Sequence, residues 1–83
     1  MKKQELKQRL ICEQIPINSY WLDEGGPCLG EVYCLSKNKN TWEVYYSERG
    51  QKTNLKVFDD EETACDYFYD WLIKSLRRMK LIN

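Results

Sequence analysis

Four consecutive carboxylates, Asp59-Asp60-Glu61-Glu62, form the densest group of side chains in this sequence that could do chemistry. Carboxylate oxygens are the ligands that calcium and magnesium prefer. Acidic residues are also favoured in the first turn of an α-helix, where the helix dipole is positive. Because the residues after this run have helical spacing, we interpret the acids as the start of a helix and predict no metal site.

Catalytic constellations are missing from the sequence. It contains no histidine, so neither a Ser-His-Asp nor a Cys-His nucleophile system can be built. The glycines in Gly25-Gly26-Pro27 lack the spacing and the lysine of a phosphate-binding loop. We therefore predict that the protein is not an enzyme and binds no cofactor.

The four cysteines contain no Cys-x-x-Cys pair, which argues against a zinc site. The sequence also has no apolar run long enough for a signal peptide or a membrane span. We expect a single domain over residues 1–83 that acts in the cytoplasm, where thiols stay reduced.

The segment Thr41–Gly50 predicts the strand around which the fold is organised. Its side chains alternate between two faces, with Trp42, Val44 and Tyr46 on one of them. A two-residue turn at Arg49-Gly50 would bring the next strand back alongside it. In that register three pairs share one face, namely Tyr46 with Thr53, Val44 with Leu55 and Trp42 with Val57.

A further strand, residues 31–37, precedes a turn at Asn38-Lys39. It pairs Leu35 with Trp42 and extends the apolar face across an antiparallel meander of three strands. That face comprises Tyr33, Leu35, Trp42, Val44, Leu55 and Val57. A short fourth strand near Tyr20 is left open, and the opposite face, with Val32, Cys34 and Tyr45, is expected to be uncovered.

Two helices are predicted to cover the apolar face. The first spans residues 2–12, and the second runs from Asp59 to about Lys80 with Asp59 or Asp60 as its N-cap. The second carries an apolar stripe at spacings of three and four, made of Cys65, Phe68, Leu72, Leu76 and Met79. The expected fold class is α+β, with both helices on one face of the sheet.

Nucleic-acid binding is one alternative function. The order helix, three strands, helix is that of double-stranded-RNA-binding domains, which contact phosphates through lysines at the start of the second helix. Four carboxylates occupy that place here, and the 13 basic and 13 acidic residues cancel. A basic cluster near the C-terminus, Lys74, Arg77, Arg78 and Lys80, keeps the alternative open. A homo-oligomer that pairs through the open sheet face or a strand edge is another.

A surface for binding another protein fits the pattern better, because exposed aromatic side chains bordered by charge are typical of interface hot spots. Tyr67 and Trp71 lie one helical turn apart beside acidic residues. The side chains that we expect to contact a partner are Tyr45, Asp59, Asp60, Glu61, Glu62, Asp66, Tyr67 and Asp70.

Residues 30–72 resemble small bacterial immunity proteins that are encoded beside polymorphic or contact-dependent toxins. The similarity is carried by Trp42–Gly50, then Phe58, Glu61 or Glu62, Ala64-Cys65 and Tyr67-Phe68. It implies a cytoplasmic protein that binds one cognate toxin and occludes its active site or substrate surface. An acidic face would suit a basic nuclease toxin, although the zero net charge differs from the usual acidic immunity protein.

Overall fold

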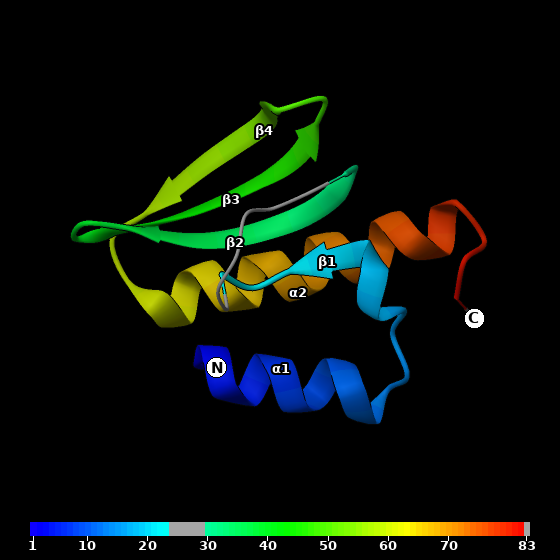
Figure 1. The fold of residues 1–83 in the computed structure, drawn as a ribbon. Coiled ribbons are helices and arrows are strands. Elements are labelled where there is room, and N and C mark those ends of the chain that lie inside the picture. Colours follow the sequence, from blue (N-terminus) through cyan, green and yellow to red (C-terminus); the bar gives the residue numbers. More distant parts are fainter. Residues whose placement is uncertain (24–29, 83) are drawn as a thin grey trace.

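The computed structural model describes residues 1–23 and 30–82. It confirms the predicted α+β class, with a helix near each end of the chain and a sheet between them (Figure 1). The elements in chain order are α1 (Lys3–Cys12), the 3-10 turn η1 (Ile17–Ser19), β1 (Tyr20–Trp21), β2 (Val32–Asn38), β3 (Thr41–Glu48), β4 (Gln51–Phe58) and α2 (Glu61–Arg78). None of the described helices combines the length and the apolar character that crossing a bilayer requires.

The sheet has four strands in the order β1-β2-β3-β4. Strands β2, β3 and β4 form the predicted antiparallel meander, and the open question of a short strand near Tyr20 is answered by β1. This strand runs parallel to β2, with Tyr20 opposite Tyr33, so the sheet is mixed and not purely antiparallel. The predicted loop at Gly25-Gly26-Pro27 lies outside the described residues.

The β2–β3 hairpin keeps the predicted face but not the predicted pairs. Leu35 lies opposite Val44, whereas the sequence had suggested Trp42. The reason is the turn, which consists of Lys39 and Asn40, with Lys39 at a positive φ of 58°. A shift of two residues leaves every side chain on its own side of the sheet, because strand side chains repeat with a period of two.

The β3–β4 hairpin begins as predicted and then departs from the expected register. Arg49 and Gly50 form its turn with φ of 49° and 78°, and Tyr46 lies opposite Thr53. Beyond Thr53 the register shifts, and Val44 pairs with Lys56. β4 therefore has one extra residue here, a β-bulge that Asn54 makes possible with a φ of 55°.

The bulge overturns two core predictions. Leu55 is 44% exposed and Val57 is 55% exposed, and Val57 pairs with Glu43 on the face away from the helices. Phe58 instead lies opposite Trp42 and packs against the main core. The prediction that Leu55 and Val57 belong to the inner face is wrong, because one inserted residue moves the side chains beyond it to the other face.

Asn54 gives a direct test of the bulge. We expect Asn54→Val to lower the free energy of unfolding by about 1–2 kcal/mol, because a β-branched side chain is strained at positive φ. Asn54→Gly should leave it nearly unchanged, since glycine adopts this conformation without strain. Urea denaturation followed by circular dichroism measures both. Equal effects of the two substitutions would contradict the bulge.

Helix α2 lies directly under the three long strands, and α1 lies below α2 (Figure 1). The carboxylate of Asp60 accepts the Thr63 backbone N–H at 2.9 Å, which confirms the predicted N-cap. Four of the five predicted stripe residues, Cys65, Phe68, Leu72 and Leu76, are buried. Met79 is exposed, because the helix ends at Arg78 and Met79 is its C-cap.

Helix α1 is attached to α2 by both apolar and polar contacts. Leu6 and Leu10 are fully buried in the shared core, which confirms the predicted apolar side of this helix. At the surface the Tyr69 hydroxyl donates to Glu13 at 2.6 Å, and the Arg9 guanidinium lies 4.3 Å from the centre of the Tyr69 ring. The short α1 is thus held by tertiary packing.

The sheet face away from the helices carries its own small core. Val32, Cys34 and Tyr45 are buried there, with Trp21 packed against them. The prediction that this face is uncovered is wrong at these positions, since only 7% of Tyr45 is exposed. Glu43 is buried on the same face and accepts hydrogen bonds from Lys52 at 2.8 Å and Asn38 at 3.0 Å.

The Glu43 contacts predict an acid-sensitive stability. Hydrogen bonds from Lys52 and then Asn38 lower the pKa of the Glu43 carboxyl below its ordinary value of 4.5. A group with a lowered folded-state pKa stabilises the protein at neutral pH, and this contribution disappears as the pH falls below about 4.5. We expect Glu43→Gln to cost about 1–3 kcal/mol at pH 7.

The measurement is urea denaturation at pH 7 and pH 3. Between these values the original protein should lose more stability than Glu43→Gln does, because the variant lacks this titrating group. Glu5→Gln, a change on the exposed side of α1 that keeps a side-chain acceptor for the Lys2 backbone N–H, serves as the control. If the Glu43→Gln variant loses as much stability as the original protein, the linkage to Glu43 is disproved.

Candidate protein-binding site

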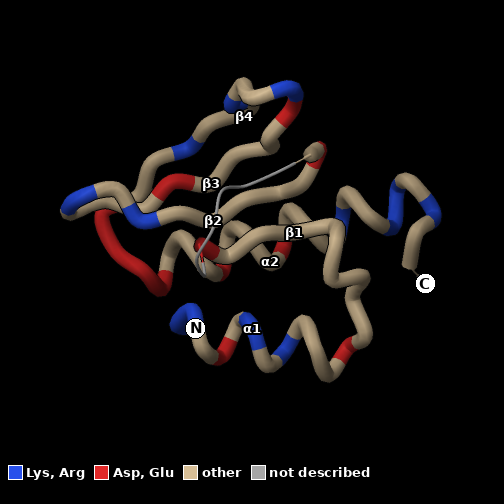
Figure 2. Tube along the Cα trace, in the orientation of Figure 1, with Lys and Arg blue, Asp and Glu red and all other residues tan. Residues whose placement is uncertain are grey.

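The four carboxylates predicted as contact residues lie where the chain enters α2 (Figure 2). Two of them are used within the fold. Asp60 caps the helix, and the Thr63 N–H lowers the pKa of its carboxyl. Glu61 accepts the backbone N–H of Lys3 at 2.8 Å. Asp59 and Glu62 are exposed at the same end of α2, so this end presents an acidic surface.

The two acids further along α2 face different neighbours. The carboxylate of Asp66 accepts a hydrogen bond from the amino group of Met1 at 2.8 Å, so the Asp66 side chain lies toward α1. Asp70 pairs with Lys74 at 3.0 Å, one turn along the exposed side of α2. The predicted acidic residues are therefore divided among the helix start, the α1 side and the exposed side. Among the described residues no three His, Cys, Asp or Glu side chains are grouped so that they could hold a metal ion.

The thiols lie apart from this surface. Cys65 is buried, and burial raises the pKa of its thiol to about 11, so that it stays protonated at neutral pH. Cys12 is exposed at the end of α1, and Cys34 is buried on the far face of the sheet. Cys28 lies outside the described residues.

Tyr67 is the predicted contact residue that the structure places most favourably. It is 38% exposed, and its ring lies 5.2 Å from Phe58 and 6.3 Å from Trp71, measured between ring centres. Trp71 in turn meets Tyr33 edge to face at 4.7 Å, and Tyr33 lies 4.8 Å from Tyr46. These five rings, which we call the aromatic row, run between α2 and the helix-facing side of the sheet.

A hollow of about 450 Å³ lies on the exposed side of α2 beside Tyr67 and Trp71. We call it the α2 groove, and its walls are Tyr67, Asp70, Trp71, Lys74, Ser75 and Arg78. The aromatic side chains of Tyr67 and Trp71 are bordered by two cationic residues, Lys74 and Arg78, and by the carboxylate of Asp70. Lys56 pairs with Val44, a core residue, and so belongs to the helix-facing side of β4. The surface is mainly basic.

Strand β4 adds an exposed edge to this region. It has a neighbour on one side only among the described strands, and each of its residues is exposed or partly exposed. Edge strands offer unpaired backbone groups to a partner, and lysines or bulges at such edges disfavour indiscriminate pairing. Lys52, Lys56 and the Asn54 bulge have this character. β4 is linked to the α2 groove through Phe58, whose ring contacts Tyr67.

Sequence reasoning identified part of this site and missed the rest. The spacing of Tyr67 and Trp71 indicated the aromatic edge, and Asp70 was correctly expected beside it. Lys74 and Arg78 were considered as part of a basic cluster for nucleic-acid binding, although both line the groove. The approach of Phe58 depends on the bulge and left no signal in the sequence. Tyr45 lies on the other side of the sheet and does not join this site.

A scan against protein-family models gave no match, and searches of curated proteins and of solved structures gave none either. The geometry of the chain itself is therefore the basis for a functional proposal.

Proposed function

We propose that this chain is a protein-binding inhibitor, an immunity protein that neutralises a cognate bacterial toxin in the cytoplasm by covering its active site or substrate surface. The observation that carries the proposal is the exposed end of the aromatic row at the α2 groove. Phe58, Tyr67 and Trp71 offer aromatic surface between charged side chains. Aromatic anchors with a polar rim are the usual composition of interface hot spots.

The charges along α2 support a single binding orientation. Its first turn is acidic, with Glu61 and Glu62, and its last turn is basic, with Arg77 and Arg78 (Figure 2). A partner with the opposite arrangement would be attracted in one orientation and repelled in the reverse one. Such complementarity mainly raises the association rate and the specificity.

The direct experiment uses the product of the gene next to the one that encodes this chain. That product should be toxic when expressed alone, and coexpression of this chain should restore growth. The two purified proteins should form a complex in size-exclusion chromatography. A neighbouring product that is harmless and forms no complex with this chain would contradict the proposal.

The RNA-binding alternative predicts a different result. The basic residues Lys74, Arg77, Arg78 and Lys80 follow one another along the end of α2 (Figure 2). A gel shift of duplex RNA at low salt that disappears in the Arg77→Ala/Arg78→Ala variant would replace the inhibitor proposal. The acidic start of α2, at the place where that family has lysines, favours the absence of such a shift.

A further inference from the structure

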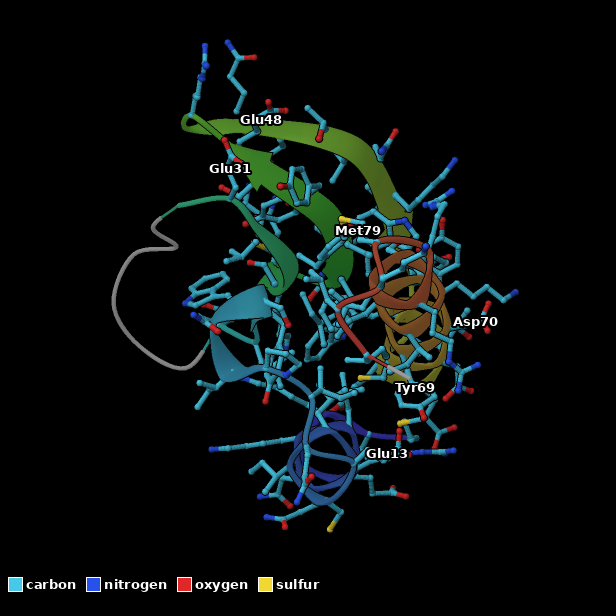
Figure 3. The ribbon with its side chains drawn as sticks, turned by 90° about the vertical axis from the view of Figure 1, so that its right-hand side faces the viewer. Glu13, Glu31, Glu48, Tyr69, Asp70 and Met79 are labelled. Atoms are coloured by element: carbon cyan, nitrogen blue, oxygen red, sulfur yellow. The ribbon has the colours of Figure 1, made fainter. Side chains whose placement is uncertain are left out.

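A second hollow lies at the other end of the aromatic row, between the start of β2, the end of β3 and the last turn of α2. Its volume is about 350 Å³. In Figure 3 Glu31, just before β2, and Glu48, at the end of β3, lie on one side of this region, and Met79 lies across from them. The residues that line the hollow include Glu31, Tyr33, Tyr46, Leu76 and Met79.

Aromatic rings form one wall of this hollow. The ring centres of Tyr33 and Tyr46 lie 4.8 Å apart, and the ring planes are inclined at 58°. Trp71 packs against Tyr33 in an edge-to-face contact. Both tyrosines are partly exposed. The face of an aromatic ring is negative, so inclined rings that line a cavity attract an organic cation.

Among the described residues that line the hollow, the one charged side chain is the carboxylate of Glu31. Burial, followed by the carboxylates of Glu31 and Glu48, raises the pKa of Tyr46 above its ordinary value. No lysine or arginine is among the described residues that line the hollow. The last turn of α2 also ends there, and the carbonyl end of a helix carries partial negative charge. Arg77, in this turn, and Lys80, just after it, line the neighbouring hollow beside Glu13, which shares Pro16 and Leu81 with this one.

We propose that this hollow binds an organic cation, specifically an alkylammonium group. The ammonium contacts the faces of Tyr33 and Tyr46 and pairs with Glu31, while the methylene chain lies against Leu76 and Met79. Two sources supply this chemistry, a free alkylamine or the side chain of a lysine in a protein. The site is distinct from the α2 groove and does not depend on the inhibitor function.

The test is a titration of the full chain, followed by ¹H–¹⁵N NMR at constant ionic strength. The probes are n-butylammonium chloride and its neutral counterpart n-butanol. Butylammonium should bind saturably with a dissociation constant on the order of 1 mM, and n-butanol at least about tenfold more weakly. The largest shifts should surround Glu31, Tyr46 and Met79. Equal affinity for both probes, or no saturable binding, overturns the proposal.

Nα-acetyl-lysine N-methylamide distinguishes the two sources of the cation. Tighter binding of this compound than of butylammonium indicates that a protein side chain occupies the site, because the added peptide groups then make contacts of their own. Weaker binding indicates a free alkylamine. Either result supports the cation site when n-butanol binds more weakly than both ammonium compounds.

Matched charge variants locate the site. Glu31→Gln should weaken butylammonium binding about fivefold to tenfold, whereas Glu5→Gln, the same change on the exposed side of α1, should leave it unchanged. Tyr46→Leu should weaken it as well, and a thermal melt establishes that this variant folds. Glu31 is exposed, so its replacement tests the site even if Tyr46→Leu is unstable. Equal affinity of the Glu31→Gln and Glu5→Gln variants contradicts the proposal.

Discussion

Leu35→Ala is expected to lower the free energy of unfolding by about 2–5 kcal/mol, whereas Leu55→Ala lowers it by less than about 1 kcal/mol. Both leucines occupy strands, and the alternation of the sequence assigns both to one apolar face. In the folded protein Leu35 is fully buried opposite Val44, and Leu55 is 44% exposed at the bulge. The cost of the first change is the lost burial plus the cavity that remains.

Urea denaturation at pH 7 measures the difference, and the identical chemistry of the two substitutions makes each variant the control for the other. A domain of this length has a total stability on the order of 4–12 kcal/mol. Leu35→Ala therefore removes a large share of it, and a circular dichroism spectrum should first establish that the variant is folded. Similar losses of unfolding free energy in both variants would indicate a register without the bulge and would contradict the structure.

Tyr67→Ala is expected to weaken the proposed complex with a cognate toxin by at least about 2 kcal/mol, a factor of about 30 in the dissociation constant. Tyr67 is an exposed ring of the aromatic row between Phe58 and Trp71, and both of these neighbours hold it in place. A rigid aromatic side chain loses little conformational freedom on binding, which is why such residues dominate interface energies. Calorimetric titration of the toxin with each variant gives the affinity.

Two further variants sharpen this measurement. Ile17→Ala removes an exposed apolar side chain from η1, outside the α2 groove, and should leave the affinity unchanged. Lys74→Gln tests the basic rim and should mainly lower the association rate and its dependence on salt. If Tyr67→Ala and Ile17→Ala bind equally well while both are folded, the toxin binds another surface and the α2 groove is not the site.

The class of fold was predictable from local patterns. Side-chain spacing, caps and turn residues indicate each helix and each strand of the meander from a few neighbouring positions. Asp59 or Asp60 was recognisable as the N-cap, of which the structure uses Asp60, and the acidic first turn of α2 followed the helix dipole. The Arg49-Gly50 turn was likewise identified correctly. Capping and turn geometry depend on neighbours along the chain, so the sequence contains what is needed to infer them.

The candidate site was only partly predictable, because it joins side chains from separate elements. The spacing of Tyr67 and Trp71 marks one helix face, yet nothing local indicates that Phe58 meets this pair. Likewise, the inclined rings of Tyr33 and Tyr46 come from two strands whose register the sequence placed two residues away. Acidic residues that looked like one block along the chain point in different directions once α1 lies beside α2.

By itself, the sequence determined the two helices and the three-stranded meander in their order, the face of β2 and β3 that turns inward, and the polarity of charge along α2, while it left β1 open. Tertiary structure alone decided the bulge at Asn54, the exposure of Leu55 and Val57, and the burial of Tyr45. The physical reason is that a bulge costs little locally, where asparagine tolerates positive φ, while its effect on burial is imposed by contacts across the sheet. Periodicity specifies faces, and packing chooses among the registers that those faces allow.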